Sequence, residues 1–407
     1  MHFVCLFSLL VTYVYGCQYF PSGDGEVASV EERSVVSGLV QRVREVGRIN
    51  KTLTLPGDWC TVPLVEEGAE VDSEALCASV SLGVRGEGRV PKIATVFLLF
   101  DEAEMVELSL YETEASTPAD ARSILHLPIV STRTFTGRPL PPRAATILQA
   151  VRGEEATSVD GVDDEFVGHV HDLLAAPNVL PYVCAQEGGD ESYSANWQRE
   201  HAARSCAAAH VRALVADGTL ADDDLVLLAD ADELLRAETW RIIRECDVSP
   251  YLGDGSSGGL AFNLDQLAYT FYYRLRARSP WPGYPDWPGP MLKRTRDFLA
   301  HGPGNVRFAR EKPTTARLHD AGWHLSPFPF GDAGRIVTKL ESWAHQEARR
   351  KAPEFRATDR WQAALESCSH CDHIRDTAYG ATLPRHVQDF PYLYEGLLDP
   401  AWADDCA

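Results

Sequence analysis

The chain has 407 residues, of which 45% are apolar and 24% charged, so it can bury a large core and is not disordered throughout. Acidic residues outnumber basic ones by 59 to 38, and the formal net charge is -21. A surface this negative repels phosphate backbones and anionic lipids, so general nucleic-acid binding and electrostatic membrane binding are disfavoured.

The N-terminal segment and the cysteines indicate the secretory pathway. Residues 3–15 form an apolar run of the length of a signal-peptide core, and Gly16 offers a small residue for cleavage. Because no Lys or Arg precedes this run, we interpret residues 1–17 either as a signal peptide or as a short uncleaved anchor. The ten cysteines suit an oxidising compartment, with at least one disulfide expected and others serving as small buried apolar residues.

The rest of the chain divides into two regions of different pattern. Residues 18–90 show little periodicity and predict a variable region or stalk, with Cys60 and Cys77 as a candidate disulfide pair. Residues 91–400 have the pattern of a folded domain. Near its start, residues 92–100 form a continuous run of β-branched and aromatic side chains, which is typical of a strand buried on both faces.

Strands and helices alternate in the next part of this domain. A helix is predicted at 194–217, because the stretch lacks Gly and Pro, has Ser194 as an N-cap and ends before Gly218. The order of elements predicts an α/β fold with a mostly parallel or mixed sheet flanked by helices. The other predicted elements are strands at 178–184, at 225–229 and within 259–276, a helix at 237–246 and a rigid aromatic loop at 280–290.

The sharpest chemical feature is the segment Asp230-Ala-Asp232-Glu233. The predicted strand before it delivers two carboxylates to its C-terminal end, where ligands bind in open α/β sheets. Two hard oxygen ligands on a turn suit Mn²⁺ or Mg²⁺, which can also bind a diphosphate and offset charge on a nucleotide leaving group. The alternative is an acidic turn that caps the next helix. The buried strand favours the metal site.

A second group of residues lies further along the domain. In Gly322-Trp323-His324, the glycine allows close backbone approach, Trp323 can stack on a sugar or base, and His324 can complete a metal site. Lys339 can supply a point charge for phosphate. Taken singly, each residue has an ordinary alternative, namely a packed Trp, a hydrogen-bonded core His and a solvated Lys.

Two further motifs are less specific. The turn-rich segment Thr134–Pro142 predicts only a loop. Cys368 and Cys371, with His370 and His373, suggest zinc, but no second ligand pair at zinc-finger spacing follows in the sequence. A disulfide from one of these cysteines to another Cys is therefore the favoured interpretation.

The order of these motifs resembles that of glycosyltransferase family 17, whose best-known members are β-1,4-mannosyl-glycoprotein β-1,4-N-acetylglucosaminyltransferases. The resemblance covers residues 92–350, and its most specific blocks are Asp-Ala-Asp-Glu at 230–233 and Gly-Trp-His at 322–324. The remaining blocks are Phe100–Leu110, which resembles an acidic and hydrophobic strand region of the family, Thr134–Pro139, Trp197–Glu200, and Lys339 with Ser342.

This resemblance implies a GT-A-like nucleotide-sugar transferase domain. The implied reaction is an inverting, metal-dependent transfer of N-acetylglucosamine from UDP-GlcNAc to a mannose of an N-glycan, in β-1,4 linkage. It places the protein in the Golgi lumen or Golgi membrane, or outside the cell if the N-terminal segment is cleaved. The implied metal ligands are Asp230, Asp232 and His324, the implied general base is Glu233, and the implied donor-binding residues are Glu104, Arg199, Trp323 and Lys339.

Three positions depart from the family pattern. Ser109 replaces an Arg, Val130 replaces an acidic residue at a strand end, and Leu235 replaces a Pro. Because the first two fall where the nucleotide pocket is expected, two other functions stay open. One is a secreted sugar-binding protein of the same fold without turnover, and the other is a transferase that uses a different UDP-sugar.

Overall fold

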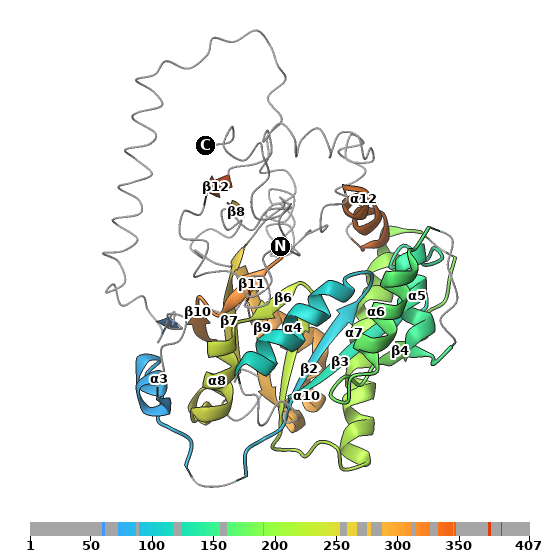
Figure 1. The fold of residues 1–407 in the computed structure, drawn as a ribbon. Helices are drawn as coiled ribbons and strands as arrows, with labels where there is room; N and C mark the ends of the chain where they lie inside the picture. The colour runs from blue at the N-terminus through green and yellow to red at the C-terminus, as the bar shows by residue number, and fades with distance from the viewer. Residues whose placement is uncertain are drawn as a thin grey trace, which may run out of the picture.

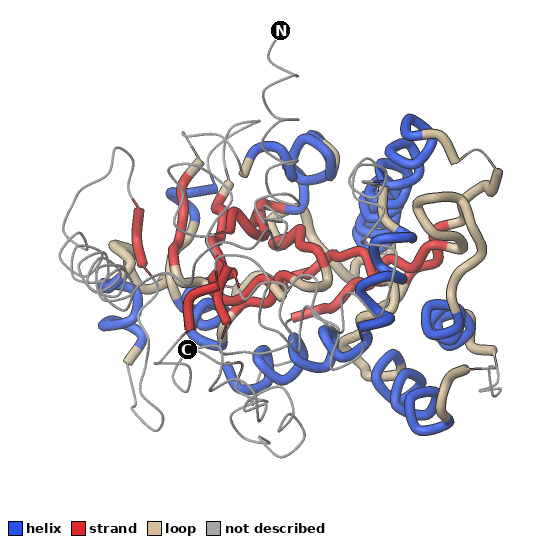
Figure 2. The backbone as a smooth tube through the Cα atoms, turned by 90° about the horizontal axis from the view of Figure 1, so that it is seen from above, coloured by secondary structure: helices blue, strands red, loops and turns tan. Residues whose placement is uncertain are grey.

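A mixed β-sheet covered by helices on both faces forms the body of the protein (Figure 1 and Figure 2). This architecture confirms the α/β class predicted from the sequence. The computed structural model describes residues 59–61, 72–86, 89–116, 124–154, 161–189, 191–252, 259–266, 275–277, 287–310, 315–325, 333–344, 346, 373–375 and 384.

The ten-stranded sheet is mostly parallel along its main path. Only β9 (Trp287–Arg294) is antiparallel to its neighbours, which are β5 (Leu225–Asp230) and β7 (Leu260–Gln266). Because the strands from β5 to β4 are parallel, their carboxyl ends meet at one edge of the sheet. The path runs β1-β10-β7-β9-β5-β2-β3-β4, with β1 at Trp59–Thr61, β10 at Ala316–His319, β2 at Ile93–Leu99, β3 at Ile124–Ser131 and β4 at Tyr182–Cys184.

A short antiparallel pair extends the sheet beside this edge. It consists of β6 (Glu233–Leu235) and β11 (Gly322–His324), and it places His324 opposite Glu233. A Cβ atom on Gly322 would collide with the carbonyl oxygen of Leu234, so glycine is required for the two strands to approach this closely. The structure thus shows the close backbone approach expected of Gly322.

Both faces of the central strands are buried, as predicted for residues 92–100. On one face, Ala94 and Val96 of β2 pack against α7 (Tyr193–Ala216). On the other face, Phe97 and Leu99 pack against α4 (Ala103–Ser116). The remaining elements are α3 (Ser73–Ser79), α5 (Pro142–Val151), α6 (Asp164–Leu174), α8 (Ala237–Glu245), α9 (Ser249–Leu252), α10 (Thr295–His301), α11 (Pro303–Ala309), α12 (Ala333–Ser342) and a separate pair of strands, β8 (Leu275–Ala277) and β12 (His373–Arg375).

Some predicted elements differ from the structure in type or boundary. Of the strand predicted at 178–184, only Tyr182–Cys184 is a strand. Most of the segment Phe100–Leu110, which resembles a strand region, belongs to helix α4. Its apolar residues Ala103, Val106 and Leu110 share one face and pack in the core, a helical spacing that the acidic residues between them obscure. Helix α7 begins one residue before Ser194, and its N-cap is Ser192, whose hydroxyl accepts a hydrogen bond from a backbone N–H at 3.3 Å.

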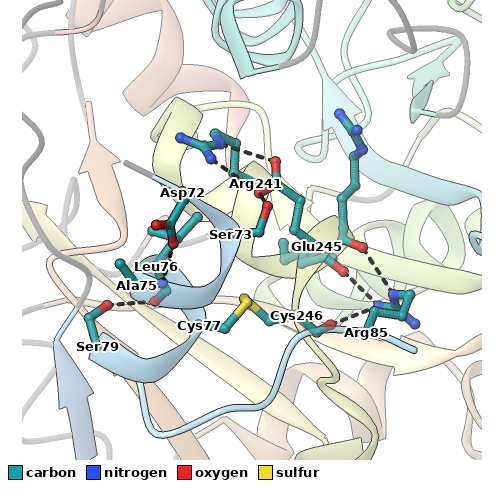
Figure 3. The surroundings of a disulfide bond; sticks show 12 residues. Asp72, Ser73, Ala75, Leu76, Cys77, Ser79, Arg85, Arg241, Glu245 and Cys246 are labelled. Carbon is teal, nitrogen blue, oxygen red and sulfur yellow. Dashed lines mark hydrogen bonds and ion pairs between the residues drawn. A yellow bond between two sulfur atoms is a disulfide. The ribbon is translucent and has the colours of Figure 1, made fainter. Parts of the chain in front are cut away.

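Among the described residues, one disulfide connects elements that are distant in the chain and another connects two consecutive elements. Cys77 of α3 pairs with Cys246 at the end of α8, which corrects the predicted pairing of Cys77 with Cys60 (Figure 3). A second bridge joins Cys184 of β4 to Cys206 of α7. Around the first bridge, Ser73 donates a hydrogen bond to Glu245 at 2.8 Å. The folded core therefore includes residues that precede residue 91.

Several predictions concern residues outside the described part of the chain. They are the N-terminal segment 1–17, residues 280–286 of the predicted loop 280–290 and the motif around Cys368 and Cys371. Residues 287–290 of that predicted loop form the start of strand β9 instead, so this part of the prediction was wrong. Among the helices that the structure describes, none is long and apolar enough to cross a membrane.

Candidate active site

Asp230-Ala-Asp232-Glu233, which we call the acidic turn, connects β5 to β6 at the edge where the parallel strands end. The side chains of β5 alternate between the two faces of the sheet, and Val226 and Leu228 pack on the α7 side. Asp230 continues this alternation and contacts residues of α7 and α11. Asp232 lies in the turn and contacts α12 instead. The two aspartates therefore have different partners, although they are two residues apart.

Arginines hold the carboxylate of Asp230. Arg204 of α7 donates to Oδ1 at 3.0 Å, and Arg307 of α11 donates to Oδ2. Arg204 also donates to Glu200, one turn earlier on α7, at 3.1 Å. Burial raises the pKa of Asp230, but the charges of Arg204 and Arg307 outweigh this effect and hold the pKa well below its usual range. Asp230 is therefore ionised, with both oxygens in ion pairs.

Glu233 is the most enclosed carboxylate of the turn, with a side chain that is 0% exposed. Its oxygens accept from Arg307 at 2.7 and 3.0 Å, from Arg310 at 3.0 Å and from the indole N–H of Trp287 at 2.9 Å. Its Oε2 also accepts from the backbone N–H of Asp230 at 2.9 Å. We call Asp230, Glu233, Arg204, Arg307 and Arg310 the arginine side of the turn.

These contacts give Glu233 an anchoring role in place of the expected role of general base. Burial raises the pKa of Glu233, but Arg307 and Arg310 outweigh it and leave the pKa below its usual value. A general base needs basicity and an oxygen within reach of the acceptor hydroxyl. Glu233 has a weakened basicity and a buried carboxylate whose oxygens already accept several hydrogen bonds.

A lysine occupies the other side of the turn. Nζ of Lys339 lies 2.8 Å from Oδ2 of Asp232 and 3.1 Å from Oε1 of Glu102, so one ammonium group joins the ends of β5 and β2. Burial lowers the pKa of Lys339, but the two carboxylates outweigh it and raise the pKa above its usual value. We call Asp232, His324, Lys339 and Glu102 the lysine side of the turn.

His324 faces Asp232 from β11. Its ring stacks on Trp287, with the ring centroids 4.2 Å apart and an angle of 11° between the planes. Nε2 lies 3.9 Å from Oδ1 of Asp232, and Nδ1 has no hydrogen-bond partner among the described residues. Burial lowers the pKa of His324, which outweighs the opposite effect of Asp232, so the imidazole is neutral at pH 7.

The three predicted metal ligands do not behave alike in this structure. The separation of 3.9 Å between His324 and Asp232 is too long for a hydrogen bond. It suits two ligands of one Mg²⁺ or Mn²⁺ ion, which lie roughly 3.0 to 4.2 Å apart when each is about 2.1 Å from the ion. Asp230 does not fit, because Arg204 and Arg307 take both of its oxygens. Accordingly, no group of three His, Cys, Asp or Glu side chains among the described residues could hold a metal ion.

Helix α12 is fixed across the same edge of the sheet. Arg335 donates to both oxygens of Glu104, at 2.9 and 3.1 Å, and to the carbonyl of Asp101 at 2.9 Å. Glu104 also pairs with Arg143 of α5. Glu104, predicted to bind the donor, thus holds α12 in place. Beside it, burial raises the pKa of Asp101 to about 6, and Arg335 only partly offsets this.

Two other predicted donor-binding residues have packing roles. Arg199 donates to the carbonyl of Phe135 at 2.8 Å and to Asn196 at 2.8 Å, so it shapes the loop after β3. Trp323 is only 2% exposed, and the guanidinium of Arg236 lies 4.7 Å from its ring centroid. A ring buried in this way cannot stack on a sugar or base. The structure therefore brings only Lys339 of the four to the acidic turn.

The sequence motifs did not identify several residues that contact the turn. Arginines on helices are usually solvated. A single sequence therefore gives no signal that Arg204 of α7 and Arg307 of α11 contact the edge of the sheet. Glu102 follows the predicted strand 92–100 closely. Its position after the C-terminal end of a strand could have identified it as a candidate site residue. The residues missed are Glu102, Arg204, Trp287, Arg307, Arg310 and Arg335.

Several solved structures of other proteins match the chain at low similarity. Two of the solved structures that match are a 4-diphosphocytidyl-2C-methyl-D-erythritol synthase and the mannosyltransferase PcManGT from Pyrobaculum calidifontis, solved with GDP-Man and Mn²⁺. The first is 18% identical over 57% of this chain and 90% of its own, with a TM-score of 0.29. The second is 11% identical over 77% of this chain and 78% of its own, with a TM-score of 0.30. No curated protein sequence matches the chain.

The family model for glycosyltransferase family 17 matches residues 175–379, half of the chain. This range contains the acidic turn, His324 and Lys339, the residues that the structure brings together. The chain therefore belongs to glycosyltransferase family 17.

Proposed function

We propose that this protein transfers N-acetylglucosamine from UDP-GlcNAc to a mannose of an N-glycan, in β-1,4 linkage and with inversion. Family membership supports glycosyl transfer as the class of reaction. The observation that carries the donor site is the convergence of Asp232, His324 and Lys339 at the carboxyl end of β5. This edge is where nucleotides bind in open α/β sheets.

Asp232 and His324 would hold a divalent cation, Mn²⁺ or Mg²⁺, because they face each other without a hydrogen bond. When bound, such an ion offsets the charge that develops on the departing diphosphate. Lys339 adds a positive charge beside it, and its ammonium can turn toward a phosphate oxygen on its flexible stem. Asp230 and Glu233 keep the turn in shape through Arg204 and Arg307.

A location in the secretory pathway, in the Golgi lumen or Golgi membrane, is part of this proposal. The two disulfides support it, because such bonds persist in oxidising compartments. In the same proposal, residues 1–17 serve as a cleaved signal peptide or as an anchor.

One observation favours the alternative of a sugar-binding protein without turnover. Val130, the residue before the last one of β3, is 2% exposed and apolar at a position where the family resemblance leads us to expect an acidic residue. Loss of a carboxylate at a strand end would weaken donor binding or catalysis more than it would weaken the fold.

The test is a donor panel. The purified full chain is incubated with Mn²⁺, an N-glycan acceptor with accessible mannose, and UDP-GlcNAc, UDP-glucose or UDP-galactose in parallel. Mass spectrometry is expected to find one added N-acetylhexosamine with UDP-GlcNAc alone, and Asp232→Asn is the inactive control. A hexose product would change the donor, and binding of UDP-GlcNAc without any product or hydrolysis would favour the sugar-binding function.

A further inference from the structure

Lys339 occupies the position where a cation would add its charge. Its ammonium lies 2.8 Å from Asp232 and 3.1 Å from Glu102, and these three side chains are 19%, 9% and 10% exposed. His324, the other side chain beside Asp232, lies 3.9 Å from Oδ1 and makes no hydrogen bond to it. Lys339 therefore already neutralises one of the two negative charges on this side of the turn.

We propose that Lys339 prevents a divalent cation from binding tightly to Asp232 until a nucleotide diphosphate is present, so that cation and donor bind cooperatively. This inference rests on the proposed function of the site. Without a diphosphate, the ion must displace the ammonium from Oδ2 of Asp232 or bind beside a like charge. A diphosphate removes this conflict, because its oxygens can accept both the ammonium and the ion.

When a diphosphate binds, the ammonium of Lys339 must move from Asp232 to a phosphate oxygen, whereas α12 can stay in place. Arg335, one turn before Lys339, ties the helix to Glu104 through two hydrogen bonds. At the other end of α12, the backbone N–H of Phe135 donates to the carbonyl of Ser342 at 2.9 Å. With both ends held, the four-carbon stem of Lys339 can carry its charge to a new partner. Arg204 and Arg307, by contrast, hold Asp230 with planar guanidinium groups on two separate helices.

The experiment measures Mn²⁺ binding by calorimetry on the full chain, with and without UDP as the diphosphate probe. In the wild type, UDP is expected to tighten Mn²⁺ binding at least tenfold, and by reciprocity Mn²⁺ tightens UDP binding by the same factor. Lys339→Met should bind Mn²⁺ at least tenfold more tightly than the wild type without UDP. In this variant, UDP should tighten Mn²⁺ binding by less than threefold. Lys339→Gln is a second neutral variant for the case that the first does not fold.

Two control variants separate charge from helix anchoring. Lys339→Arg keeps the positive charge and should bind Mn²⁺ as weakly as the wild type without UDP. Arg335→Met loosens α12 but leaves the ammonium on Asp232, so it should keep the wild-type effect of UDP. If Arg335→Met instead reproduced Lys339→Met, helix anchoring would be the cause and the inference would be wrong.

Equal Mn²⁺ affinity of the wild type and the neutral Lys339 variants without UDP would overturn the inference. The inference would also be wrong if no variant bound Mn²⁺ even in the presence of UDP. In that case, transfer of N-acetylglucosamine in metal-free buffer would still support the proposed function. Conversely, coupling between Mn²⁺ and UDP that Lys339 controls, without transfer from any donor, would support the inference and refute the proposed function.

Discussion

The two sides of the acidic turn show how one motif divides its residues between structure and chemistry. On the arginine side, Asp230 is held by guanidinium groups from two helices, which are permanently charged and fix the carboxylate in several directions. On the lysine side, Asp232 has one oxygen on the ammonium of Lys339 and the other facing His324 without a hydrogen bond. Only the second arrangement leaves a carboxylate oxygen for a ligand.

The alternation of strand β5 explains this difference. Leu225 and Leu227 pack on one face of the sheet, while Val226 and Leu228 pack on the α7 side. The last residue of the strand, Asp230, is carried to the same side as Leu228 and meets Arg204. An Asp-x-Asp motif at a strand end therefore does not imply that both carboxylates bind the same ion.

The largest expected effect is that of Asp232→Asn on transfer. The substitution keeps the side-chain volume and removes the one carboxylate that faces His324. We expect kcat/KM with UDP-GlcNAc to fall at least about 1000-fold, equivalent to roughly 4 kcal/mol of transition-state stabilisation. The measurement is a transfer assay at saturating Mn²⁺, with a calorimetric test of Mn²⁺ binding. Wild-type turnover in this variant would remove Asp232 from the metal site.

Asp230→Asn should act on stability instead. It removes one of the anionic partners of Arg204 and of Arg307, which keep Glu200 and Glu233 respectively. Because hydrogen bonds to charged groups are weakened rather than all lost, we expect a loss of about 2 kcal/mol. Urea unfolding should detect this loss, while the Mn²⁺ concentration for half-maximal activity stays within about twofold of the wild type. A variant with unchanged stability and a greatly raised Mn²⁺ requirement would restore Asp230 as a metal ligand and end the distinction between the two sides.

The pH dependence of the free energy of unfolding tests the electrostatics around Asp101, which adjoins Glu102 of the lysine side. Burial raises the pKa of Asp101 to about 6 from the usual value near 3.8. The unfolded chain therefore loses this proton before the folded one, and the free energy of unfolding falls by up to about 3 kcal/mol as pH rises from 4 to 6. Asp101→Asn should remove this loss, so its stability relative to the wild type rises across the window.

The control for this experiment has the opposite sign. Although burial raises the pKa of Glu104, Arg335 and Arg143 outweigh it and hold the pKa below its usual value. Its stabilising effect is present above the unfolded pKa and is lost as pH falls through the folded one. Glu104→Gln should therefore lose stability relative to the wild type as pH rises, and unfolding curves from pH 3 to 7 measure both variants. A flat difference for Asp101→Asn would contradict the raised pKa.

The central strands and the acidic turn could be predicted from the sequence because they depend on local pattern. The apolar runs at 92–100 and 225–229 match β2 and β5, and the turn follows at the expected strand end. The partners of the turn could not be predicted, because they depend on which helices the sheet order brings together. Arg204 and Arg307 lie on α7 and α11, more than 100 residues apart in the chain, yet both contact Asp230. The pairing of Cys77 with Cys246 was missed for the same reason.

His324→Ala should have the smallest effect and the most specific one. Loss of a single imidazole ligand should raise the Mn²⁺ concentration for half-maximal activity about tenfold, because Asp232 and the diphosphate still hold the ion. The matched control is His126→Ala, which removes a fully buried imidazole of β3 whose ring nitrogen lies 3.4 Å from the hydroxyl of Thr113. This control should lower the melting temperature and leave the Mn²⁺ requirement unchanged. If His324→Ala behaved like His126→Ala, with a large fall in melting temperature and no change in metal dependence, His324 would be a core residue stacked on Trp287 and the lysine side would offer Asp232 alone.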